Sequence, residues 1–162
     1  MATKKLATEA EIYHAGIDFL SRRDYAAGEL KQKLLSKIEP DDEDARALVS
    51  VVLERLESLG YQSDERYIEM LVRARKERGY GPQYIRQYLQ QYRLEPSLVE
   101  AYVDSRSFEW KEYAYRQLEK KFHQPSRELK VRQKQQRHLY QRGFDSDQIR
   151  WAMDRLDELS EE

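Results

Sequence analysis

The chain has 162 residues, of which 36% are charged, and its formal net charge is -1. Because it has no cysteine, a disulfide framework, a thiolate metal site and a cysteine nucleophile are excluded. It has no run of the roughly 18 apolar residues that a membrane span needs, and no apolar stretch near Met1 that would indicate a signal peptide. We therefore expect a cytoplasmic protein that does not bind membranes.

The charges are segregated along the chain. Residues 66–93 have 7 basic and 2 acidic side chains, and residues 106–142 have 11 basic and 4 acidic ones. The end segments, residues 1–65 and 143–162, each have a net charge of -5. Two basic blocks can form a positive patch on a protein that is nearly neutral as a whole, and such a patch favours polyanions or acidic partners.

Helix start and stop signals occur in three sets. In the first set, residues 1–7 are expected to form a flexible tail, and Thr8 with Glu11 forms a capping box that starts a helix. Asp24 is the expected cap of a second helix. The acidic run 41–44 suits the N-terminus of a third helix, because the helix dipole favours negative charge there.

The second set repeats this plan. A helix capped by Ser63 or Asp64 ends at Gly79, where a left-handed residue is expected after the helix. Pro82 suits the first position of the next helix, since its missing N–H would be unpaired there anyway. A third helix begins near Pro96.

In the third set, Ser107 precedes a helix from which Phe108, Tyr115, Leu118 and Phe122 are expected to face inward. Pro125 separates this helix from a basic helix over roughly residues 126–142. Asp145 or Ser146 caps the last helix.

The third set repeats the second. Residues 89–99 align without a gap with residues 139–149, and the apolar positions coincide: Leu89, Leu94, Val99 and Val103 correspond to Leu139, Phe144, Ile149 and Met153. A period of about 50 residues predicts small helical units that stack along one direction. The predicted fold is all-α, an elongated, curved array of three tandem three-helix repeats that span residues 1–62, 63–106 and 107–162.

Several segments together carry a family resemblance. They are residues 20–34 (LSRRDYAAGELKQKL), 59–61 (LGY), 64–67 (DERY), 78–82 (RGYGP) with Ile85, Arg86 and Leu89, 121–122 (KF) and 139–144 (LYQRGF). In order and spacing they resemble the RecX regulatory proteins over nearly the whole chain.

The resemblance implies a tandem array of three-helix units that binds the recombinase RecA, above all its active filament on single-stranded DNA. RecX-like proteins lie in the helical groove of that filament and restrain its ATP hydrolysis, strand exchange and co-protease action. The resemblance thus implies a modulator and not an enzyme, and we expect it to act as a monomer without a cofactor.

The middle of the chain interleaves cations with tyrosines. The cluster comprises Arg66, Arg73, Arg75, Lys76, Arg78, Arg86 and Arg93, with Tyr80, Tyr84, Tyr88 and Tyr92. Cations bind phosphates and aromatic faces stack on unpaired bases, while Tyr and Arg also anchor protein interfaces. The alternative is a solvated helix face on which Glu69 and Arg73 form an i, i+4 pair.

A second basic candidate lies in the third repeat. Steps of 3, 4 and 3 residues place four cations on one helical stripe: Arg127, Lys130, Lys134 and Arg137. Leu129, Leu139 and Tyr140 fall roughly opposite, so the stripe is expected to face solvent. It is predicted to contact DNA phosphates or acidic residues of a partner, although a lone basic stripe can also be merely a solvated face.

No catalytic, cofactor or metal site is predicted. The acidic run 41–44 lacks the spaced ligands and glycine of a calcium-binding loop. His14, His123 and His138 lack metal-ligand spacing, and the chain has neither a glycine-rich phosphate loop nor an ordered triad.

Two hypotheses of different classes remain. The first is a regulator that bridges protomers of a RecA filament, with possible direct contact to its single-stranded DNA. The second is an autonomous DNA-binding helical array that acts without RecA. A net charge near zero weighs against the second hypothesis.

Overall fold

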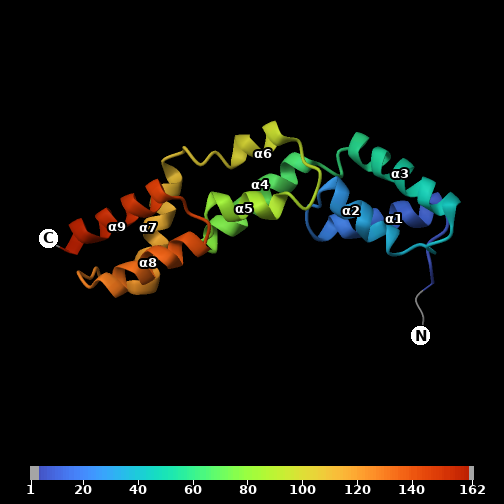
Figure 1. The fold of residues 1–162 in the computed structure, drawn as a ribbon. Coiled ribbons are helices and arrows are strands. Elements are labelled where there is room, and N and C mark those ends of the chain that lie inside the picture. The colour runs from blue at the N-terminus through green and yellow to red at the C-terminus, as the bar shows by residue number, and fades with distance from the viewer. Residues whose placement is uncertain (1–3, 161–162) are drawn as a thin grey trace. The chain divides into compact units, whose positions relative to one another are not determined.

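The computed structural model describes residues 4–160, so the first three residues of the predicted tail lie outside it. In this part the chain is all-α and contains no strand (Figure 1). Its helices are α1 (Glu9–Arg22), α2 (Ala27–Leu35), α3 (Glu43–Ser58), α4 (Asp64–Glu77), α5 (Pro82–Leu89), α6 (Pro96–Tyr102), α7 (Glu109–Phe122), α8 (Leu129–Gln141) and α9 (Ser146–Ser160). None of these helices is long and apolar enough to cross a membrane.

The helices fall into two compact units, which are described separately. Unit 1 comprises Met1–Met70 and Tyr92–Leu94, and unit 2 comprises Leu71–Gln91 and Glu95–Glu162. The boundary falls inside α4, so the first half of this helix belongs to unit 1 and the second half to unit 2.

In unit 1, the helices α1, α2 and α3 pack on one another around an apolar core. The core residues are Ile12, Tyr25, Leu30, Leu34, Ile38, Ala45, Val49, Val52 and Leu56. The predicted capping box is confirmed, because Thr8 Oγ1 accepts from the N–H of Glu11 and Glu11 Oε1 accepts from the N–H of Thr8, each at 3.2 Å. Leu6, within the predicted tail, packs against this core and donates its N–H to the carbonyl of Lys37 at 2.8 Å.

The start of α2 differs from the prediction. The helix begins at Ala27, and Asp24 does not cap it. Instead, Asp64 Oδ1 accepts the N–H of Ala27 at 2.8 Å, so the cap comes from a distant part of unit 1. Asp24 pairs with Arg66 at 3.4 Å. The local sequence pattern could not show this, because the capping side chain lies 37 residues away along the chain.

A partly buried ion pair lies between the end of α1 and helix α2 in unit 1. Arg23 donates both terminal nitrogens to the carboxylate of Glu29, at 2.9 and 2.8 Å, and its guanidinium lies 3.7 Å from the ring centroid of Tyr25. The hydroxyl of Tyr92 donates to Glu29 Oε2 at 3.3 Å. The bidentate bond to Glu29 raises the pKa of Arg23. Glu29 is therefore a nearly buried carboxylate that is both ion-paired and hydrogen-bonded.

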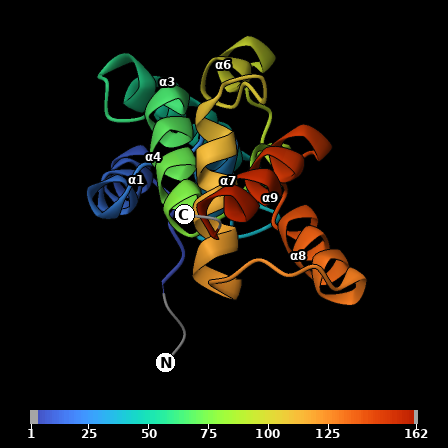
Figure 2. The ribbon, with the colours of Figure 1, turned by 90° about the vertical axis from the view of Figure 1, so that its left-hand side faces the viewer.

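In unit 2, the helices α7, α8 and α9 form a bundle in which α9 lies against α7 (Figure 2). The side chain of Phe108 is 53% exposed, so the prediction that it faces inward is wrong. Trp110 fills the core instead, and its indole N–H donates to the carbonyl of Asp104 at 3.0 Å. Phe108 lies one residue before α7 and packs edge-on against Trp151.

Helix α9 begins with a reciprocal cap. Asp145 Oδ1 accepts the N–H of Gln148 at 2.8 Å, and Gln148 Oε1 accepts the N–H of Asp145 at 2.9 Å. Asp145, one of the two predicted candidates, is thus the capping residue. The predicted helix starts at Pro82 and Pro96 are also confirmed.

Candidate partner-binding surface

Two glycine-containing turns of unit 2 dock on each other through their backbones. The turn between α4 and α5 donates the N–H of Gly81 to the carbonyl of Arg142 at 2.7 Å, and the N–H of Gln83 to the carbonyl of Gly143 at 3.0 Å. The guanidinium of Arg142 donates in return to the carbonyl of Arg78. We call this contact between residues 78–83 and 142–143 the turn joint.

The turn joint leaves no room for a side chain at position 81 or at position 143. A Cβ atom added to Gly81 would lie 2.5 Å from the carbonyl oxygen of Gly143, and one added to Gly143 would lie 2.5 Å from the amide nitrogen of Tyr84. Both distances are far below van der Waals contact with a backbone atom that cannot turn away. The segment RGYGP at residues 78–82 therefore has a structural role in joining two parts of unit 2.

Tyr80, a predicted binding residue, belongs to the turn joint. Its ring stacks on that of Tyr84, with 4.0 Å between the centroids, and the guanidinium of Arg142 lies 4.2 Å from its centroid. Stacking and cation–π contacts of this kind hold an aromatic side chain in place. Tyr80 thus already has an intramolecular stacking partner.

Three cations of the middle cluster are bound within their own units. In unit 1, Arg66 donates to the carbonyl of Gly60 at 2.6 Å, besides its pair with Asp24. In unit 2, Lys76 contacts Glu109 at 2.7 Å, and Arg86 donates to the carbonyl of Val103 at 2.6 Å. Arg86 also pairs with Glu100 at 2.9 Å. These cations hold helix ends and loops together.

The remaining cations of the middle cluster differ in exposure. Arg73, Arg78 and Arg93 are exposed, while Arg75 is half-buried against the ring of Tyr88, 4.7 Å from its centroid. Arg93 belongs to unit 1 and the other three to unit 2. The residues of a cluster that appears continuous in sequence thus differ in how far they are exposed and in which unit they belong to.

The basic stripe of the third repeat lies largely on α8. Lys130, Lys134 and Arg137 are exposed there, and none of the three forms an ion pair with any residue in the range 4–160. Arg127 is exposed too, but it precedes α8, so the prediction that all four cations share one helix is wrong. The helix starts only at Leu129, after an irregular segment that begins beyond α7.

The side of α8 that was expected to face inward is only partly covered. Leu139 is fully buried, but Leu129 is 70% exposed and Tyr140 is 73% exposed. Gln135, one helical turn before Leu139, is the other buried residue of this helix, and it donates to the carbonyl of Gln124 at 3.3 Å. Only a small part of α8 is therefore buried, and two large apolar side chains of this helix lie in solvent.

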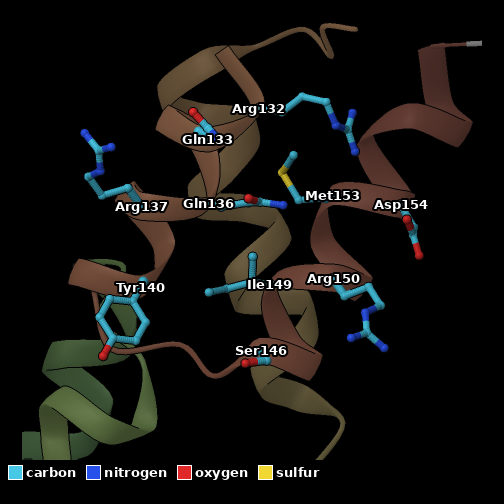
Figure 3. Close-up of a pocket in the computed structure, with 10 residues that line it drawn as sticks. All are labelled: Arg132, Gln133, Gln136, Arg137, Tyr140, Ser146, Ile149, Arg150, Met153 and Asp154. Atoms are coloured by element: carbon cyan, nitrogen blue, oxygen red, sulfur yellow. The ribbon is translucent and has the colours of Figure 1, made fainter. Parts of the chain in front are cut away.

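Tyr140 lies at the edge of a groove between α8 and α9 (Figure 3). The groove has a volume of about 660 Å³. Ile149 and Met153 of α9 line it, and both are almost completely buried. Arg137 and Arg150 line it from α8 and α9. The repeat pattern marks Ile149 and Met153 as apolar positions, but the groove depends on how the two helices pack, which the sequence does not show.

The arginines that line the groove differ in whether they already form an ion pair. Arg132 forms a bidentate pair with Asp157, at 3.1 and 3.3 Å. Arg137 and Arg150 have no carboxylate within ion-pair distance among residues 4–160. A guanidinium without an ion-pair partner can donate two parallel hydrogen bonds to a carboxylate or a phosphate.

His138 of α8 faces the bundle and not the groove. One of its ring nitrogens, Nε2, lies 2.9 Å from Nε2 of Gln117 on α7. Burial lowers the pKa of His138, and the nearby cations Arg142 and Lys121 lower it further. No group of acidic, His or Cys side chains in residues 4–160 is arranged to hold a metal ion.

Comparison with protein-family models identifies the chain. The second three-helix domain of RecX matches residues 63–106, and the third three-helix domain of RecX matches residues 109–153. The chain belongs to the RecX family.

Proteins that are named RecX are similar to this chain over most of their own length. The Regulatory protein RecX of Legionella pneumophila (strain Corby) is 38% identical over 138 residues, which cover 85% of this chain and 89% of the relative. The Regulatory protein RecX of Vibrio parahaemolyticus is 35% identical over 159 residues, 98% of this chain and 99% of the relative. These relatives are named as regulatory proteins and not as enzymes.

A solved RecX structure has the same fold. The crystal structure of RecX from Lactobacillus salivarius superposes with a TM-score of 0.73 and covers 92% of this chain and 96% of its own. Its sequence identity is 21%, so the agreement concerns the fold alone. The prediction of an all-α array of three-helix repeats is thereby confirmed.

Proposed function

We propose that this RecX family member regulates the recombinase RecA by binding the filament that RecA forms on single-stranded DNA. The observation that carries the proposal is family membership along nearly the whole chain, with 98% of it aligned to a regulatory protein RecX. The proposed outcome of binding is inhibition of ATP hydrolysis, strand exchange and co-protease action. The proposed location is the helical groove of the filament.

The proposed contact residues are the cations that remain exposed. They are Arg127, Lys130, Lys134 and Arg137 near α8, and Arg73 and Arg78 near the end of α4. Such cations suit the phosphates of the filament's DNA or acidic side chains of RecA. Arg66, Lys76, Tyr80 and Arg86 are proposed to act indirectly, because their internal contacts hold turns and helix ends of their own units in place.

The proposed mechanism is bridging. An array of repeats that contacts more than one RecA protomer would obstruct the incoming duplex. To inhibit, it must also bind a less active or dissociating filament state more tightly than the active one, since a ligand shifts an equilibrium only through differential affinity. We propose that a monomer suffices for this, acting in the cytoplasm without a membrane partner.

The proposal is tested by the rate of RecA ATP hydrolysis on single-stranded DNA while this protein is titrated in. Strong suppression well below one copy per RecA protomer is the expected result, and it would favour capping or propagated disassembly over obstruction of single sites. Unchanged hydrolysis at saturation, with tight binding to free DNA, would instead support the second candidate function. That candidate is an autonomous DNA-binding protein, which the unpaired cations of α8 favour.

A further inference from the structure

The groove between α8 and α9 combines an apolar floor with an exposed aromatic side chain. Met153 is 3% exposed and Ile149 is 9% exposed, and both line the groove. Tyr140, which is 73% exposed, stands beside them (Figure 3). A large apolar side chain of a partner would mainly cover the exposed ring of Tyr140, since Met153 and Ile149 expose little surface, and would gain hydrophobic free energy there. Tyrosine is enriched at such positions because it gives a large contact area at low entropic cost.

Cations without partners flank this floor. Arg137 projects from α8 on one side of the groove and Arg150 from α9 on the other (Figure 3). Neither has an ion-pair partner within residues 4–160, whereas Arg132 at the end of the groove is neutralised by Asp157. The groove thus offers two charge-assisted bonds, one on each side of an apolar anchor site.

The charges on the α9 side of the groove favour the carboxylates of a peptide over the phosphates of a nucleic acid. Asp154 of α9 lines the groove and is the one acidic residue among its lining residues in the part of the chain that the structure describes. A continuous phosphate backbone that followed the groove would pass the carboxylate of Asp154 and be repelled by it, whereas Asp157 is already paired with Arg132. A peptide can place single carboxylates at the two arginines and neutral side chains opposite Asp154. The charge pattern therefore favours a protein segment over a nucleic acid strand.

We propose that this groove binds an acidic amphipathic segment of the recombinase in its filament. One large apolar side chain of the segment packs on Met153, Ile149 and Tyr140, and carboxylates on either side of it pair with Arg137 and Arg150. Such recognition resembles the docking of an amphipathic helix in an apolar groove, with the flanking charges fixing register. This proposal rests on the proposed function, because the segment that it places in the groove belongs to the recombinase whose regulation is proposed above.

The first test places a photoreactive amino acid, p-benzoylphenylalanine, at position 140 of the full chain. Filaments of RecA on single-stranded DNA are irradiated with this variant, and cross-linked peptides are sequenced by mass spectrometry. A cross-link to a RecA segment with an apolar residue flanked by Asp or Glu is expected. A cross-link only to DNA, only to a second copy of this chain or only to a RecA segment without carboxylates would overturn the proposal. So would no cross-link from a variant that still inhibits ATP hydrolysis.

The second test reverses the two groove charges in the variant Arg137→Glu, Arg150→Glu. Its affinity for the RecA filament is expected to fall about tenfold or more, since each reversal replaces an attraction by a repulsion. The matched control is Lys31→Glu, Lys33→Glu, which makes the same charge change on exposed residues of α2 in unit 1. Equal affinities of the two variants would overturn the groove proposal and leave the proposed function standing. If the unmodified protein neither binds the filament nor changes its ATP hydrolysis, the proposed function itself fails.

Discussion

Gly81 donates its backbone N–H to the carbonyl oxygen of Arg142 at 2.7 Å, and thereby ties the turn before α5 to the turn after α8. The same backbone contact explains why glycine stands at position 81. A side chain there would collide with the carbonyl of Gly143, which is itself held by the N–H of Gln83. The most distinctive segment of the sequence is thus a docking element within unit 2.

The variant Gly81→Ala is expected to destabilise unit 2 by about 2 kcal/mol, because the added methyl group must push two backbone segments apart. The measurement is the free energy of unfolding in urea. The control is Gly60→Ala, since Gly60 lies in the turn after α3 and has no atom within 4 Å of an added Cβ. At its φ of +80° the control should lose only about 1 kcal/mol from left-handed strain. A Gly81 variant no less stable than the control would show that the turn joint can relax.

Removing the side chain of Asp64 is expected to cost about 1 kcal/mol, because the N–H of Ala27 at the start of α2 loses its cap. Asp64 also accepts from the side chain of Gln62, which binds the carbonyl of Tyr25. The comparison is Asp24→Ala, at the residue that the local pattern favours as the cap. Its bond to Arg66 is long and exposed, so its loss should cost less than about 0.5 kcal/mol. The opposite ranking in urea unfolding would contradict this assignment.

These two sites also show what the sequence can predict. Helix ends marked by local chemistry were found correctly, such as the capping box at Thr8, the proline at position 82 and the cap at Asp145. Each of these signals is contained in a few consecutive residues. The cap from Asp64 and the turn joint were not found, because both join segments that only the tertiary fold brings together.

The same limit applies to the candidate partner-binding surface, where contacts between distant segments decide which residues are available. Composition correctly located the basic blocks, but whether a cation is free depends on carboxylates and carbonyls from other segments. Lys76 is neutralised by Glu109 and Arg86 by Glu100, neither of which is a helical neighbour. The exposure of Tyr140 could not be predicted either, because a helical pattern shows which face is apolar but not how much of it a neighbour covers.

Two consecutive arginines provide a matched pair of variants. Arg23→Ala leaves the nearly buried carboxylate of Glu29 with only the hydroxyl of Tyr92, and should cost about 2 kcal/mol. This is less than for a fully buried pair, because the side chain of Arg23 is 39% exposed. Arg22→Ala removes an exposed i, i+4 pair with Asp18 and should cost less than about 0.5 kcal/mol. Equal losses in urea unfolding would show that burial does not strengthen the Arg23 pair.

The stability of unit 2 is expected to fall as the pH drops through the titration range of His138. Burial lowers the pKa of this side chain in the folded state, with a further contribution from the charges of Arg142 and Lys121. Between the folded and unfolded pKa values the unfolded chain binds more protons, so acid favours unfolding. Above the unfolded value of about 6.5 both states are neutral and the effect vanishes.

The measurement is the free energy of urea unfolding at a series of pH values between 5 and 8. His138→Gln should flatten the part of the profile below about pH 6.5, because glutamine does not titrate there. In the neutral form, Nε2 of His138 can accept a hydrogen from the amide of Gln117, which a protonated ring cannot do. An unchanged slope in the variant would assign the pH dependence to other groups.

Reversing the charges of Lys130 and Lys134 is expected to weaken binding to the RecA–DNA filament about tenfold at low salt and to leave helicity unchanged. Both side chains are exposed on α8 and have no ion pair in residues 4–160, so their replacement by Glu removes no internal contact. The difference should shrink as salt is raised, because exposed charges are screened within about 8 Å at physiological ionic strength. Filament binding is followed by fluorescence anisotropy and helicity by circular dichroism. Unchanged affinity at modest salt would exclude this face of α8 from the interface, whereas weaker binding with intact helicity would place it there.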